Sequence, residues 1–91
     1  MSTKEKIQEK VAVLEQEMLQ NEIILFNDEI HTFQFVINSL IDVCDHTIEQ
    51  AEQCTYLVHY KGKCVVKTGE YDELKWRCTR LLNLGLSAEI I

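Results

Sequence analysis

Apolar residues recur at helical spacing in four segments of the chain. The first covers residues 2–20, where the apolar positions lie three or four residues apart, at Ile7, Val11, Leu14 and Met18. This spacing puts them on one face of a helix, and Ser2 and Glu5 stand three apart, as in a capping box. A stripe this short is marginal in water without a surface to pack on. We therefore expect residues 1–21 to be an N-terminal extension whose helix forms only against the core, a neighbour or a partner.

Two more helices are predicted in the middle of the chain. The first starts near Thr32 and turns these side chains inward: Phe33, Val36, Ile37, Leu40, Ile41 and Cys44. The second begins at the capping box formed by Thr47 and Gln50. It ends before Gly62, a plausible left-handed stop. Its apolar stripe consists of Ile48, Ala51, Cys54, Thr55 and Val58.

Short strands and a last helix complete the pattern. Residues 23–26 are a run of strand formers ended by Asn27 and Asp28. Residues 63–68 read as a second strand, with Cys64, Val65 and Val66. Residues 70–84 read as a helix closed by Gly85, and residues 86–91 as a final strand. The inward positions of that helix are predicted to be Leu74, Cys78, Leu81 and Leu82.

The resulting order is β-α-α-β-α-β, an α+β fold in residues 22–91. We expect three antiparallel strands with the three helices packed on one face, because strands this short need helices to cover them. With 91 residues and 46% hydrophobic content, the chain can build one modest core but not two. We expect a monomer.

Charge is unevenly distributed along the chain. The net charge is −6, and residues 11–60 carry nine acidic residues and no Lys or Arg. Phosphate-backbone binding needs clustered cations, so this half argues against a nucleic-acid partner. The same field favours a cationic ligand. No apolar stretch is long enough to span a membrane, and no secretory signal is visible, so we expect a cytoplasmic protein with no membrane partner.

The four cysteines are best explained as small buried hydrophobes. A disulfide framework is not expected in a cytosolic chain. Cys44 and His46 could supply two zinc ligands, but structural zinc sites bring closely spaced pairs from two places. A thiol enzyme would need an activated cysteine, and the end of a helix near Cys44 disfavours a thiolate. We expect no catalytic residue, no metal and no cofactor.

The loop that follows the first strand is the better candidate site. An amide and two carboxylates, from Asn27, Asp28 and Glu29, could accept the hydrogens of an ammonium group. The same residues could equally form an ordinary strand-to-helix turn. His59 adds a polar group on the second core helix, four residues after Thr55, so both share a face.

At these residues the chain resembles the ClpS adaptor family. The loop motif, with Phe35, Val36 and Ile37 beyond it, is like the family's V-x-N-D-D…F-V-I. The stretch 58–63, VHYKGK, is like its V-H-Y-x-G-K, and 68–75, TGEYDELK, is similar to its T-A-E-x-x-E-x-K. The closing strand at residues 86–91 also matches, so the resemblance covers residues 22–91.

The resemblance implies a non-enzymatic adaptor. Such proteins bind N-degrons, that is, proteins that begin with Leu, Phe, Tyr or Trp, and deliver them to the N-terminal domain of a Clp-type AAA+ unfoldase. It implies that the α-amino group is held by Asn27, Asp28 and His59. It implies a side-chain pocket lined by Phe33, Val36, Thr55 and Leu86, and unfoldase docking through Glu70 and Lys75. The extension, residues 1–21, would reach toward the unfoldase pore.

Four positions depart from the family pattern. The family usually has Met where Phe33 and Thr55 stand, and Thr-Pro where His31 and Thr32 stand. We expect a roomier pocket floor at Thr55 and good acceptance of aromatic first residues, and we assign His31 no role. The alternatives that remain open are a plain protein-interaction domain of the same fold, as in ribosomal stalk C-terminal domains, and a thiol enzyme or metal protein.

Overall fold

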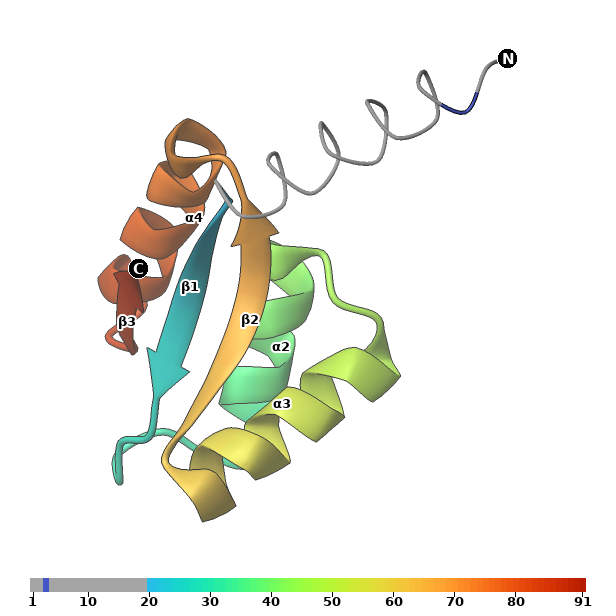
Figure 1. Cartoon of the computed structure of the whole chain (residues 1–91). Helices are drawn as coiled ribbons and strands as arrows, with labels where there is room; N and C mark the ends of the chain where they lie inside the picture. The colour runs from blue at the N-terminus through green and yellow to red at the C-terminus, as the bar shows by residue number, and fades with distance from the viewer. Residues whose placement is uncertain (1–2, 4–19) are drawn as a thin grey trace.

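The computed structural model describes Thr3 and residues 20–91. The predicted element order is confirmed (Figure 1). The elements are β1 (Asn21–Phe26), α2 (Phe33–Cys44), α3 (Ile48–Lys61), β2 (Lys63–Gly69), α4 (Tyr71–Asn83) and β3 (Ser87–Ile90). The helix predicted at residues 2–20, with its capping box at Ser2 and Glu5, lies outside the described residues. The boundary predicted at residue 22 remains a prediction.

The three strands form one antiparallel sheet in the order β2-β1-β3. The register between β1 and β2 shifts after Ile23, which marks a bulge in β2. In the central strand, Ile23 and Leu25 are fully buried and Ile24 between them is half-buried. This alternation shows that one face of β1 carries the core. Helix α4 contacts all three strands, and α2 and α3 contact β2.

Side-chain caps mark the predicted starts of α2 and α3, and a glycine marks the predicted end of α3. Thr32 caps α2, since its hydroxyl accepts a hydrogen bond from the Phe35 N–H at 3.1 Å. Both hydrogen bonds of the Thr47–Gln50 capping box are present at the start of α3. Gly62 ends α3 in the left-handed conformation, with φ of 92°, which favours glycine because it has no Cβ. These local signals are strong enough to set the boundaries.

Three inward predictions are wrong, those for Leu82, Ile48 and Phe33, and the Phe33 side chain at the first position of α2 is 38% exposed. Leu82 is 51% exposed, because the buried face of α4 runs through Leu74, Arg77, Cys78 and Leu81 instead. Arg77 can lie there because its guanidinium donates to the Val43 carbonyl at 2.6 Å and forms ion pairs with two carboxylates, Asp45 and Glu73.

Ile48 is also more exposed than predicted, at 60%, because it occupies the first position of α3, at the end of the stripe. Val43 and Ser39 of α2 are buried although the pattern did not select them. Among the described residues, no helix combines the length and apolar character that crossing a membrane requires.

Candidate functional site

The end of β1 and the end of α3 are joined by a backbone hydrogen bond. The Asn27 N–H donates to the Gly62 carbonyl at 2.9 Å, and the Gly62 N–H donates to the Val58 carbonyl at 3.0 Å. The left-handed stop of α3 therefore brings the polar loop after β1 beside the last turns of that helix. Those turns carry His59, so residues more than thirty positions apart share one neighbourhood.

A small cavity opens at this junction, with a volume of about 30 Å³. All seven residues predicted for the ligand site line it: Asn27, Asp28, Phe33, Val36, Thr55, His59 and Leu86. The residues predicted to bind an amino group and those predicted to line a side-chain pocket thus surround one cavity. Four further lining residues were not predicted: Leu25, Phe26, His31 and Val58.

The inner wall of the cavity is apolar. Leu25, Val58 and Leu86 are each at most 5% exposed. Thr55 is also buried, and its hydroxyl donates to the Ala51 carbonyl within the same helix at 2.7 Å. Because that hydrogen is already used, the hydroxyl adds little polarity to the wall. The wall is suited to an apolar side chain.

Phe33, the first residue of α2, forms part of the rim of this cavity. Its ring packs edge-on against His59, with centroids 4.9 Å apart, and against Tyr56 at 5.5 Å. A cavity of about 30 Å³ holds roughly one water molecule, so a Leu or Phe side chain cannot enter it unchanged. The half-exposed Phe33 ring is the side chain best placed to move aside.

Asp28 is held as a carboxylate by the loop residues that lead into α2. Its Oδ1 accepts hydrogen bonds from the Ile30 and His31 backbone N–H groups, both at 2.9 Å. Burial acts to raise the pKa of Asp28, but these bonds and the His31 side chain together outweigh it and lower the pKa. Asp28 therefore stays negatively charged at neutral pH.

His31 belongs to this site, although we expected no role for it. Its ring Nδ1 lies 2.9 and 3.0 Å from the two oxygens of Asp28. Since an ionised carboxylate only accepts, Nδ1 carries the hydrogen. The ring stacks on the Phe35 ring, with centroids 4.8 Å apart. Its Nε2 would lie only 3.3 Å from a Cβ placed on Gly85. The available sequence signal was its spacing of three residues from Asp28.

The two residues predicted to dock an unfoldase lie on α4 and do not line the cavity. Glu70 is the N-cap residue of α4 and is exposed. Lys75 lines a shallow hollow of about 450 Å³ on α4, together with the 45% exposed Trp76. Both are accessible to a partner.

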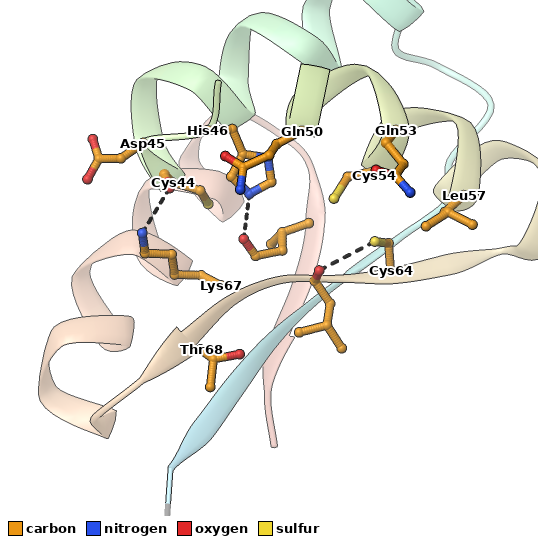
Figure 2. Close-up of a pocket in the computed structure, with 12 residues that line it drawn as sticks. Cys44, Asp45, His46, Gln50, Gln53, Cys54, Leu57, Cys64, Lys67 and Thr68 are labelled. Carbon is orange, nitrogen blue, oxygen red and sulfur yellow. Dashed lines mark hydrogen bonds between the residues drawn. The ribbon is translucent and has the colours of Figure 1, made fainter. Parts of the chain in front are cut away.

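The alternative sites around the cysteines find less support. Figure 2 shows Cys44, His46, Cys54 and Cys64 around a groove between α3 and β2. His46 Nε2 donates to the Val66 carbonyl at 2.6 Å. Burial raises the pKa of Cys44 to about 11, which opposes a catalytic thiolate. Within residues 20–91, no three or more His, Cys, Asp or Glu side chains are grouped so as to hold a metal ion.

Known proteins are similar to this chain in sequence and in fold. The family model of the ATP-dependent Clp protease adaptor protein ClpS matches residues 16–89. The ATP-dependent Clp protease adapter protein ClpS of Thermosynechococcus vestitus is 30% identical over 81 residues, covering 88% of this chain and 86% of the relative. The protein of that name from Campylobacter jejuni subsp. jejuni is 30% identical, covering 89% and 95%.

A solved structure has the same fold at lower identity. It is Agrobacterium tumefaciens ClpS2 bound to L-phenylalaninamide, with a TM-score of 0.75 and 20% identity over 79% of this chain and 94% of that one. The family match spans both halves of the cavity, from Asn27 to Leu86. The chain belongs to the ClpS family, the non-catalytic adaptors of the ATP-dependent Clp protease.

Proposed function

We propose that this adaptor captures proteins by their N-terminal residue and delivers them to a Clp-type AAA+ unfoldase. The ligand would be a free α-ammonium group followed by a Leu, Phe, Tyr or Trp side chain. Its ammonium group would be held by Asn27, Asp28 and His59, and its side chain would be buried against Val36, Thr55 and Leu86. The observation that carries this proposal is the single cavity that all of these residues line.

The first side chain of the ligand and its ammonium group contribute binding free energies of similar size. Burying a Leu or Phe side chain contributes about 1.5–3 kcal/mol, and each hydrogen bond to a charged group about 1.5–3 kcal/mol. Two or three such bonds, added to the apolar contribution and reduced by the cost of association, come near the ~8 kcal/mol of micromolar binding. Neither half reaches that value alone, so an internal Leu is rejected.

The ligand of the Agrobacterium protein has the chemistry that this proposal requires. L-phenylalaninamide carries a free amino group and an aromatic side chain, and its carboxyl is an amide, as in a peptide. In this chain, Phe33 would move aside to admit such a ring. The cavity has a volume of only about 30 Å³, so the room expected for aromatic residues would come from that movement.

Replacing Asp28 with Asn is the direct test of the amino-group site. Asp28→Asn keeps an oxygen that can cap the Ile30 and His31 N–H groups but removes the charge. We expect affinity for a Leu-first peptide to fall about 10- to 100-fold, the loss of one charge-assisted hydrogen bond, in a fluorescence titration. The circular dichroism spectrum should not change.

The matched control is Glu29→Gln, which removes the same charge from the same loop. Glu29 is exposed and does not line the cavity, so its replacement should change affinity less than threefold, through the general field alone. Equal losses of affinity in the two variants would mean that Asp28 acts only through its contribution to the net charge. The proposed amino-group site would then be without support.

Docking on the unfoldase is proposed to use α4 and to be separate from peptide capture. Glu70→Ala and Lys75→Ala should leave the affinity for a Leu-first peptide unchanged, because neither residue lines the cavity. Degradation of a Leu-first reporter by the unfoldase and its peptidase should slow severalfold. Undiminished degradation by the double variant would remove α4 from the docking surface. The extension, residues 1–21, is proposed to reach toward the unfoldase pore.

A further inference from the structure

A second concave surface lies between α3 and the edge strand β2, and two thiols face each other across it. The groove has a volume of about 590 Å³ and shares no lining residue with the cavity described above. Cys54 projects from α3 and Cys64 from β2, both side chains line the groove, and the two thiols are neighbours (Figure 2). Both are half-buried, whereas the other two cysteines, Cys44 and Cys78, are buried in the core.

We propose that Cys54 and Cys64 are a modification site, at which a hydroperoxide converts the two thiols into an intramolecular disulfide. Three features select this pair: the two thiols are neighbours, they come from two different elements, and both line the groove. Disulfides in cytosolic proteins are usually transient and respond to oxidants. The site is independent of the proposed capture of N-termini.

The reaction proceeds in two balanced steps. In the first, the Cys64 sulfur attacks one peroxide oxygen, the O–O bond breaks, and a sulfenic acid and one water form when hydrogen peroxide is the oxidant. In the second, the Cys54 sulfur attacks the Cys64 sulfur, the S–OH bond breaks, and a second water leaves. The two cysteines lose two electrons and two protons in total, and the peroxide is reduced.

Cys64 is assigned the first step because the thiolate of Cys54 is disfavoured. It is the second residue of the edge strand β2, and its thiol hydrogen donates to the Val65 carbonyl at 3.4 Å. Burial, with the neighbouring Cys64 thiol, raises the pKa of Cys54 to about 12. Cys54 is therefore a poor first nucleophile at neutral pH, and its thiolate fraction grows about tenfold with each pH unit. Disulfide closure should accelerate as the pH rises.

The bond would tie α3 to the sheet. It closes a loop of about ten residues that contains His59 and the turn at Gly62, and a short loop of this kind restricts the unfolded chain. The oxidised protein should melt on the order of 10 °C higher than the reduced protein. Adding a dithiol reductant should restore the original melting temperature.

Mass spectrometry on the full chain tests the site. The reduced protein is treated with hydrogen peroxide at pH 7 and pH 8.5, its free thiols are blocked, and it is digested with trypsin without reductant. Lys61 and Lys63 lie between the two cysteines, so cleavage leaves two peptides joined only through sulfur. The expected product is that cross-linked pair, formed faster at pH 8.5, with Cys44 and Cys78 blocked as free thiols.

Single variants provide the controls. Cys54→Ser and Cys64→Ser should each abolish the cross-linked pair and the rise in melting temperature, while the matched core thiols remain free. The proposal is overturned if Cys54 and Cys64 are recovered unlinked at both pH values. It is also overturned if the dominant bond joins either of them to Cys44, to Cys78 or to a second chain.

Discussion

Leu81→Ala is expected to lower the free energy of unfolding by about 2–5 kcal/mol, the range for deleting a buried leucine side chain. Leu81 lies on α4 and is fully buried. Its removal leaves a cavity where α4 packs on β1 and β3. A domain of this size has only about 5–15 kcal/mol of stability, so the loss should be plain in a urea denaturation curve as a lower midpoint with an unchanged slope.

The neighbouring residue supplies the control. Leu82→Ala removes the same atoms one position further along α4, but from a side chain that is 51% exposed. This substitution should change the free energy of unfolding by less than about 1 kcal/mol. If the two variants lost equal stability, α4 would have to pack on the sheet through a different face from the one described.

These two leucines also show how much of the packing of α4 could be predicted from the sequence pattern. Apolar spacing predicted α4 and three of its four buried positions, Leu74, Cys78 and Leu81. The pattern predicted Leu82 as buried instead of Arg77, because it assigns a charged residue to the solvent-facing side of the helix. Arg77 is buried because the Val43 carbonyl and the Asp45 carboxylate come from elsewhere in the chain to pair with it, in addition to Glu73 one turn away on α4. Tertiary partners of this kind are not visible in a local pattern.

The candidate site, too, could be predicted from the sequence only in part. The loop motif at Asn27 and the stretch containing His59 were recognisable as local sequence, and the structure brings both to one cavity. Spacing along the chain could not predict how they approach, because the Asn27–Gly62 hydrogen bond joins segments 35 residues apart (62 − 27). His31 was missed since its pairing with Asp28 depends on how the loop turns into α2.

The small volume of the cavity, about 30 Å³, has a consequence for affinity. With Phe33 packed on His59, the pocket must open before a large side chain enters. The population that is open sets how much of the intrinsic affinity is realised. Ligand binding would therefore separate the Phe33 and His59 rings, which links the apolar wall to one of the three groups proposed to hold the amino group.

Acetylation of the ligand's α-amino group is expected to have the largest effect on binding. An acetylated amine has no charge and a single N–H donor, so it cannot satisfy Asn27, Asp28 and His59 together. Asp28 would be left partly desolvated and without its partner on the ligand, since its lowered pKa keeps it ionised at neutral pH. Leaving such groups unpaired costs about 3 kcal/mol or more, or about 100-fold in affinity.

The most direct measurement is a fluorescence titration of the full chain with a labelled Leu-first peptide and with its Nα-acetylated twin. The two ligands share every side chain, so their difference isolates the amino group. We predict micromolar binding of the free peptide and affinity at least about 100-fold weaker for the acetylated one. Equal affinities would contradict recognition of the N-terminus and would favour a domain that binds its partners through internal sequence.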